Sequence, residues 1–379
     1  MSLAPDTSAP VLDGLDWDNA LDMVLSGTGV DVHFQPIVDV SQRLIVGYEA
    51  LARFESVPSA TPDLWFAAAR QRGLVPDLEL AVLRRTLSLR DDLPPGCFLS
   101  LNLEPDVLSD PRIQNLLATQ RSLSGIVIEF TEHIDAGEIA GLAGRIAELR
   151  SAGAKIAVDD AGAGYSGLKR IIELEPDYLK IDRSLVMDLD RNEANSAIVE
   201  MLGNFAARID AWVIAEGVER PAELDRLRRL RIPLVQGYLL ARPLPGYQGL
   251  GAAGQGVLAA TPVVDDEVPT IRTILETPAW VLDKDIDSAH TILANRSDLD
   301  VVVVVDADRR PVGCVTRDND RGTMGPVWRA WAGTPVRDLA RRIVTRPTND
   351  RYAATVCCDA AGKLLGVVRL ERVLFELSN

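Results

Sequence analysis

Apolar and polar positions along the chain alternate in a way that predicts short strands separated by longer helices. After a short helix predicted over 17–25, the runs VHFQPIVDV and LIVGYEALARF predict two strands joined by a polar turn at Ser41 and Gln42. So short a connection predicts an antiparallel pair, because a parallel pair needs a long crossover. Apolar residues then recur at helical spacing over 62–89.

Six further apolar runs predict strands beyond residue 95, and helical patterns such as 139–149 and 197–207 separate most of them. These runs cover 97–101, 126–128, 156–158, 178–179, 212–215 and 234–235. With the opening pair they make eight strands, a number that suits a closed α/β barrel. An open doubly wound sheet remains the alternative, although no GxGxxG motif follows the first strand.

Side chains able to bind a metal or a phosphate stand at nearly every predicted strand end. In a barrel the carboxyl ends of the strands share one rim, so these side chains would converge there. A single polar residue at a strand end is usually structural, but so complete a set predicts a functional site. Its members are Glu49, Arg53, Asn102, Glu129, Glu132, Asp159, Asp160, Lys180, Asp182, Glu216, Glu219 and Gln236.

The donor types at this rim favour metal-assisted chemistry at phosphorus. Oxygen ligands select Mg²⁺ or Mn²⁺, and the three histidines lack zinc-ligand spacing. The adjacent Asp159 and Asp160 would let two cations, about 4 Å apart, share one carboxylate cluster and clamp an in-line displacement. Lys180 would hold the attacking water, and Arg53 would bind a phosphate. The pattern therefore predicts hydrolysis of a phosphodiester.

The barrel pattern stops near residue 245. The Gly-rich stretch from residue 246 shows no periodicity and predicts a linker. Beyond it, a strand–turn–strand pattern over 301–315 recurs over 355–370, each copy after a helix-like start at 271–275 or 336–343. We therefore expect an N-terminal extension (1–30), a barrel (31–245), a linker (246–264) and a smaller α+β domain (265–379).

Composition narrows the class of protein. The net charge of −15 argues against binding of a nucleic-acid polymer, which needs a basic surface. No apolar stretch is long enough to span a membrane, and the N-terminus lacks a signal-peptide pattern. The four cysteines have no metal-ligand spacing and predict free thiols in a reducing cytoplasm.

The motifs resemble the EAL-domain cyclic di-GMP phosphodiesterases over about 31–245. The tripeptide Glu49–Ala50–Leu51 lies in FQPIVD…GYEALARF, and LNLEPDVL, IEFTE, VDDAGAGYSGL, YLKIDRSLV, VIAEGVE and VQGYLLARPLP follow in family order. The resemblance implies a (β/α)₈ TIM-type barrel with one antiparallel strand, a homodimer, and cleavage of cyclic di-GMP to linear pGpG.

Roles for individual residues follow from the same resemblance. It implies that the metal ligands are Glu49, Asn102, Glu129, Asp159, Asp160 and Glu216. Lys180 and Gln236 would act on the catalytic water, Gln35 and Arg53 would contact substrate, and Asp182 would orient Lys180. Glu132 would brace the loop after Asp160, and Glu219 would support the rim.

The loop after Asp160 departs from the family pattern, because Ala161 stands where an aromatic residue is usual and Gly167 replaces a commoner serine. Small residues there predict a looser loop. Two alternatives therefore stay open: a receptor that binds cyclic di-GMP without turnover, and a hydrolase of another cyclic dinucleotide.

The C-terminal repeat resembles a CBS-domain pair, a regulatory module that often binds adenine nucleotides. Thr316 stands where a ribose contact would fall, but the acids after it, Asp318 and Asp320, are out of register, and the second copy is shortened. A structural or dimerising role is favoured over nucleotide binding.

Overall fold

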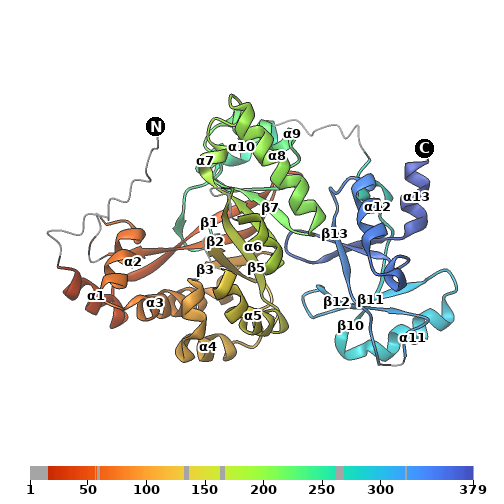
Figure 1. Ribbon diagram of the computed structural model, residues 1–379, viewed down its shortest axis with the longest axis horizontal. Helices are drawn as coiled ribbons and strands as arrows, with labels where there is room; N and C mark the ends of the chain where they lie inside the picture. Colours follow the sequence, from red (N-terminus) through yellow and green to blue (C-terminus); the bar gives the residue numbers. More distant parts are fainter. Residues whose placement is uncertain are drawn as a thin grey trace.

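Two units follow one another along the chain, a barrel of strands surrounded by helices and a smaller unit made from the C-terminal segment (Figure 1). The computed structural model describes residues 16–55, 57, 60–131, 136–162, 167–260, 269–320 and 322–378. In this part of the chain, no helix combines the length and apolar character needed to cross a bilayer.

The barrel closes through one antiparallel strand, as predicted. Strands β2 to β8 are parallel neighbours in chain order, and β1 pairs antiparallel with both β2 and β8. A short strand, β9 (Leu244–Pro245), pairs antiparallel with His33 and Phe34 of β1. The barrel strands are β1 (Val30–Asp39), β2 (Leu44–Phe54), β3 (Phe98–Asn102), β4 (Ile126–Thr131), β5 (Lys155–Ala161), β6 (Tyr178–Ile181), β7 (Trp212–Ala215) and β8 (Leu234–Val235).

Helices and short 3₁₀ turns connect these strands and surround the barrel. They are α1 (Trp17–Leu25), α2 (Pro62–Gln71), α3 (Val75–Ser88), η1 (Arg90–Asp92), η2 (Pro105–Ser109), α4 (Pro111–Ala118), α5 (Ala136–Ser151), α6 (Gly167–Leu174), α7 (Arg183–Val186), α8 (Glu193–Arg208) and α9 (Pro221–Arg229).

Helix α1 packs on the barrel, although it lies in the predicted N-terminal extension. The Asp16 side chain caps it by accepting the Asn19 N–H. Trp17 and Leu21 are buried in the main core, and the Trp17 ring meets the Trp65 ring edge-on at 5.3 Å. The apolar face of α1 therefore makes it part of the barrel core.

The stretch predicted as a linker contains a helix, α10 (Ala252–Ala260). Leu258 is buried, and a Cβ on Gly254 would lie 2.3 Å from the Leu240 carbonyl oxygen. Only glycine permits this close approach. The helix shows no apolar periodicity because alanine and glycine supply most of its residues.

The C-terminal unit repeats one topology twice, so the predicted internal repeat is present. In each sheet a strand, a helix and a parallel strand are followed by an antiparallel hairpin partner. The first copy contains β10 (Ala279–Leu282), η4 (Asp283–Asp285), α11 (Ile286–Asn295), β11 (Val301–Val305) and β12 (Pro311–Thr316); the second contains β13 (Trp328–Trp331), α12 (Val336–Thr345), η5 (Thr348–Asp350), β14 (Thr355–Cys358) and β15 (Leu364–Val368), and α13 (Leu370–Leu377) follows.

One element of the repeat was misplaced by the sequence pattern. The helix of the first copy is α11, whereas the segment expected to start that copy forms a 3₁₀ turn, η3 (Ile271–Ile274). Ile271 and Ile274 pack in the core of the second sheet with Leu339 and Val373. Their apolar spacing therefore reflects packing against a neighbouring sheet.

The hairpin between β14 and β15 closes the amino end of the barrel. Phe98, Tyr178 and Trp212 begin their strands at that end, and Ala360 is fully buried among them. The Tyr178 hydroxyl donates a hydrogen bond of 2.6 Å to the Ala360 carbonyl. The opposite end of the barrel, where the strands finish, stays available for a site.

Candidate functional site

A fully buried lysine lies at the centre of the carboxyl end of the barrel. Lys180 Nζ is 2.7 Å from both Glu129 Oε2 and Glu216 Oε1, 3.2 Å from Asp159 Oδ2 and 3.3 Å from Glu49 Oε1. These carboxylates come from strands β2, β4 and β5 and from the residue that follows β7. The predicted convergence at the rim is therefore confirmed for these five side chains.

The backbone at Asp160 brings two neighbouring aspartates to the same side. Adjacent residues in a regular strand point to opposite faces of the sheet. Asp160 has φ of 56°, in the left-handed region, and the register of β5 against β6 shifts between Val158 and Ala161. The turn lets carboxylate oxygens of Asp159, Asp160 and Glu216 lie within 4.8 Å of one another. The Asp160 N–H also donates to Asp159 Oδ1 at 2.9 Å.

Side-chain amides hold Glu49 in place. Asn102 Nδ2 donates to Glu49 Oε1 at 3.0 Å, and Gln236 Nε2 donates to Glu49 Oε2 at 2.6 Å. Gln236 Nε2 also donates to Gln35 Oε1 at 2.9 Å, and Gln35 Nε2 donates to the Ala241 carbonyl at 3.0 Å. The predicted residues Gln35, Asn102 and Gln236 thus join one network with Glu49.

One ammonium is shared among four acids, and this sets their protonation. Burial raises the pKa of Glu129 to about 8, helped by the charges of Glu49 and Asp159, and burial also raises the pKa of Glu216. Burial acts against a charged Glu49 too, yet the charge of Lys180 and the amide hydrogen bonds hold its pKa below the usual value. Burial likewise opposes the Lys180 ammonium, but the carboxylates keep its pKa well above normal.

The arrangement fits two divalent cations. Carboxylate oxygens of Glu49, Glu129 and Asp159 also lie within 4.8 Å of one another, so Asp159 belongs to both this group and the Asp159–Asp160–Glu216 group. A shared carboxylate is what two neighbouring cations require. An all-oxygen donor set suits hard cations such as Mg²⁺, Mn²⁺ or Ca²⁺. Cations bound here would displace the protons that burial favours on these acids.

A hollow of about 510 Å³ opens beside this ring, and Arg53, Phe66, Asn102 and Glu129 line it. Arg53 Nη1 donates to the Ala52 carbonyl at 2.8 Å. The hollow is large enough for part of an organic ligand. The residue predicted to bind a phosphate therefore lies next to the acidic ring.

Two other residues that were predicted to belong to the site are not among the contacts of Lys180 in the described part of the chain. The Asp182 carboxylate caps α7 by accepting the Ser184 N–H at 2.9 Å, so its contacts are those of a helix cap and do not orient Lys180. Glu219 Oε1 pairs with Arg183 Nη2 at 2.8 Å, away from the lysine. Glu132 lies outside the described residues.

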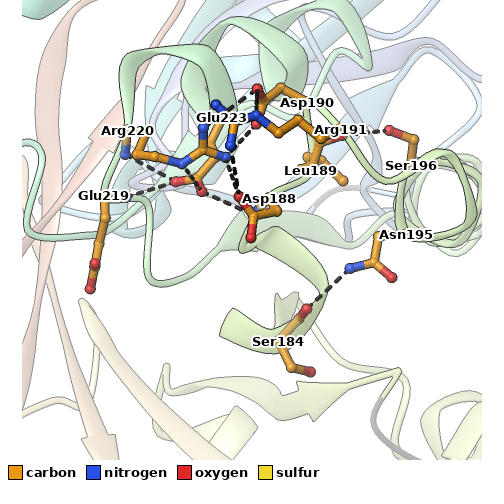
Figure 2. Close-up of polar contacts among 10 residues, drawn as sticks. All are labelled: Ser184, Asp188, Leu189, Asp190, Arg191, Asn195, Ser196, Glu219, Arg220 and Glu223. Atoms are coloured by element: carbon orange, nitrogen blue, oxygen red, sulfur yellow. Dashed lines mark hydrogen bonds and ion pairs between the residues drawn. The ribbon is translucent and has the colours of Figure 1, made fainter.

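A third acidic group holds two loops of the rim together (Figure 2). Its carboxylates, from Asp188, Asp190 and Glu223, surround the Arg220 guanidinium, which lies 3.0 Å from both Asp188 Oδ1 and Glu223 Oε1 and also pairs with Asp190. Glu223 Oε2 accepts the N–H groups of Glu219 and Arg220 at 3.0 Å. Arg220 pairs with all three carboxylates, and Arg191 pairs with two of them, so the group braces the loop after Glu216.

Sequence reasoning missed two polar residues near the ring. Ser100 is fully buried and its hydroxyl donates to Glu129 Oε1. It lies two residues before Asn102 in β3, and this spacing of two was the signal that both face the site. Glu79 of α3 lines the hollow and occupies the apolar face of its helix, where burial raises its pKa to about 8.

Comparisons with known proteins agree with this geometry. Residues 18–243 match the sequence model of the EAL domain. The probable cyclic di-GMP phosphodiesterase PdeB of Escherichia coli K12 is 34% identical over 224 residues, which cover 56% of this chain and 42% of that protein. The cyclic di-GMP phosphodiesterase NbdA of Pseudomonas aeruginosa is 31% identical over 243 residues, 61% of this chain and 31% of that protein.

The chain is also similar to solved structures of proteins in complex with cyclic di-GMP. The phosphodiesterase PaMucR, in complex with c-di-GMP, superposes with a TM-score of 0.54 at 29% identity and covers 61% of this chain and 98% of that one. BlrP1 of Klebsiella pneumoniae, in a calcium and cyclic di-GMP complex, gives 0.52 at 31% identity and covers 59% and 58%. The chain spans less than half of the length of the curated relatives described above.

Proposed function

Because the chain belongs to the EAL domain family, we propose that it hydrolyses cyclic di-GMP to linear pGpG with the help of two divalent cations, Mg²⁺ or Mn²⁺. One observation carries the proposal: Asp159 is shared by two carboxylate groups that surround the buried Lys180. A site that only bound a cyclic dinucleotide would not need a buried lysine among acids that favour protonation.

Each member of the ring has a part in this proposal. Glu49, Asn102, Glu129, Asp159, Asp160 and Glu216 would hold the cations, which supply Lewis acidity and a bound water of lowered pKa. Lys180 would lose part of its pairing with the carboxylates and turn an N–H toward the attacking water. Gln236 keeps Glu49 oriented and, with Gln35, presents amide groups to the substrate. Arg53 would bind a phosphate from the neighbouring hollow.

The proposal also includes residues and a unit outside the ring. Glu132 would brace the loop that follows Asp160, and Glu219 would support the rim through Arg183, whose Nη2 lies 2.8 Å away. The assembly would be a homodimer, and the C-terminal unit would act as a CBS-like regulatory or dimerising domain, which its repeated strand order supports. A structural or dimerising role of this unit is favoured over binding of an adenine nucleotide.

A turnover assay tests the proposal. Purified protein is incubated with cyclic di-GMP and Mg²⁺ or Mn²⁺, and pGpG is measured by chromatography. We expect product from the wild type, none from Glu49→Gln, and wild-type rates from Glu148→Gln, which changes an exposed carboxylate on α5. Binding of cyclic di-GMP without product under either cation would reject hydrolysis and favour the receptor. Faster cleavage of another cyclic dinucleotide would reassign the substrate.

A further inference from the structure

A hollow of about 260 Å³ lies where the amino end of the barrel meets the C-terminal unit. Three arginines line it: Arg228 of α9, Arg231 after that helix, and Arg272 of η3. Among the described residues that form its wall, none is an aspartate or a glutamate. The described wall of the hollow therefore carries positive charge and no carboxylate, in a protein whose net charge is −15.

Arg228 is the least expected member of this wall. Its side chain is only 8% exposed, and in the described part of the chain no hydrogen bond or ion pair reaches its guanidinium. Burial lowers its pKa, and the charge of Arg43 adds to this effect, against a smaller opposite contribution from Asp225. Its guanidinium nitrogens remain accessible to solvent, because they are not among the buried polar atoms that lack a hydrogen-bond partner. An anion that binds in the hollow would supply the missing partner.

A tryptophan joins this hollow to a second one. Trp331 and Arg231 line both, and the second hollow has a volume of about 280 Å³. Trp331 Nε1 is buried and has no hydrogen-bond partner among the described residues, and its ring lies 5.4 Å from that of Trp212. The second hollow also has carboxylates in its wall, including Asp177 and Glu200. It therefore offers an aromatic surface and acceptors for N–H groups.

We propose that the two hollows bind a nucleotide, with phosphate groups on Arg228, Arg231 and Arg272 and the base beside Trp331. Guanidinium groups bind phosphate through paired hydrogen bonds. Aromatic rings accept a flat base by stacking, and carboxylates accept hydrogen bonds from its amino groups. The joined volume falls within the range of about 300–1,000 Å³ that small-molecule sites occupy.

The site is separate from the acidic ring. Pro233 lines both hollows, and the short strand β8 (Leu234–Val235) leads from it to Gln236, which donates to Glu49 at 2.6 Å. The nucleotide would thus lie at the opposite end of the strand that positions Gln236. Its binding does not require the divalent cations or the cyclic dinucleotide.

Calorimetry on the full-length protein tests the proposal. ATP, GTP and inorganic pyrophosphate are titrated in the presence of EDTA, so that no cation occupies the acidic ring. Arg228→Met and the more conservative Arg272→Gln, at an exposed position of η3, remove phosphate contacts. Arg226→Gln changes an arginine of the same helix that pairs with Glu193 at 3.1 Å, and Arg53→Gln changes the catalytic hollow. Both serve as controls.

We expect a nucleotide to bind more tightly than pyrophosphate, and both test variants to weaken that binding by about tenfold or more, the size of one lost charge-assisted hydrogen bond. Both controls should bind like the wild type. In the absence of phosphate compounds, Arg228→Met should melt close to the wild type, because no hydrogen bond or ion pair reaches its guanidinium in the described part of the chain.

Three results would overturn the proposal. The first is that none of these compounds binds below about 1 mM. The second is that binding survives in both test variants or is lost in Arg53→Gln, which would place it elsewhere. The third is that pyrophosphate binds as tightly as either nucleotide, which would leave an anion site without a base.

Discussion

Lys180 Nζ and Glu129 Oε2 are 2.7 Å apart, and both side chains are shielded from solvent at the centre of the carboxyl end of the barrel. Three more carboxylates share the same ammonium. A single cation cannot neutralise four acids, so the ring without metal is an incomplete electrostatic arrangement. Divalent cations would complete it, and this idea leads to the first two predictions.

Lys180→Met should behave differently with and without metal. Breaking a buried ion pair costs about 3–5 kcal/mol, so the metal-free variant should melt well below the wild type. Because Mn²⁺ supplies the missing positive charge, saturating Mn²⁺ should raise its melting temperature more than that of the wild type. The turnover rate should fall by about 10²- to 10⁴-fold with Mn²⁺ present.

Differential scanning calorimetry and the pGpG assay measure these effects. Lys284→Met, at an exposed position in the C-terminal unit, is the matched control and should match the wild type in both. An equal melting temperature for Lys180→Met and the wild type without metal would contradict the assigned role of the ion pairs.

Metal affinity should rise with pH between 6.5 and 9. Burial raises the pKa of Glu129 to about 8, so below that pH a proton occupies a carboxylate that a cation needs. Titrating Mn²⁺ at several pH values between 6.5 and 9, in buffers of different ionisation enthalpy, measures both affinity and proton release. Proton release should be larger at pH 7 than at pH 9, because Glu129 loses its proton between these pH values. An affinity that is constant over this range would rule out a protonated Glu129.

Glu79→Gln should make the protein more stable at alkaline pH. Burial raises the pKa of Glu79 from 4.5 to about 8, so between these values the folded state holds a proton that the unfolded state has lost. Stability therefore falls as pH rises from about 4.5 to 8, by about 1.4 kcal/mol for each pH unit from this one group.

Glutamine keeps the hydrogen bond that Glu79 Oε1 accepts from the Glu104 N–H, and it cannot ionise. Urea unfolding of the variant should show a flatter pH profile than the wild type, with the largest gain near pH 8.5. Exposed Glu148→Gln should leave the profile unchanged. Parallel profiles for Glu79→Gln and the wild type would mean that Glu79 ionises normally.

Gly162→Ala should disturb the end of β5 and slow turnover. Gly162 has φ of +101°, and an added Cβ would lie 2.7 Å from Leu185 Cδ1 and 3.1 Å from Leu202 Cδ1. The backbone at residue 162 would have to move, and it lies only two residues after Asp160, a member of the Asp159–Asp160–Glu216 group. Gly144→Ala is the control, because an added Cβ there has no neighbour within 4 Å and should stabilise α5. Equal rates for both variants would show that the Gly162 conformation is not needed.

The barrel could be predicted from the sequence because its strands are separate apolar runs, and most of these runs end in side chains able to bind a metal or a phosphate. Their positions at the ends of predicted strands identified Lys180 and Glu129, and convergence at one rim followed from the barrel itself. The left-handed backbone of Asp160 could not be predicted from the sequence, because it accompanies the shift in register between β5 and β6. The cap formed by Asp182 was also missed, because a carboxylate after a strand looks the same whether it faces a site or starts a helix.

The spacing of apolar residues along the chain did not predict the contacts between the barrel and the C-terminal unit. Ala360 gives no signal in the sequence, and its burial among Phe98, Tyr178 and Trp212 depends on where a distant hairpin docks. The α10 helix was read as a linker for a related reason: its contact with Leu240 depends on the absence of a side chain at Gly254. Contacts that depend on alanine or glycine produce little recognisable apolar pattern in the sequence.

The hairpin that covers the amino end of the barrel has a consequence for how this protein can be divided or recombined. Its Ala360 carbonyl accepts the hydrogen bond of the buried Tyr178 hydroxyl, so a segment about 180 residues later in the chain covers the amino end of the barrel. A barrel transplanted into a fusion without residues 359–363 would carry an open, apolar base prone to self-association. The barrel of this chain therefore cannot be exchanged as an independent domain, and sequence inserted between the units must still allow that hairpin to reach the barrel.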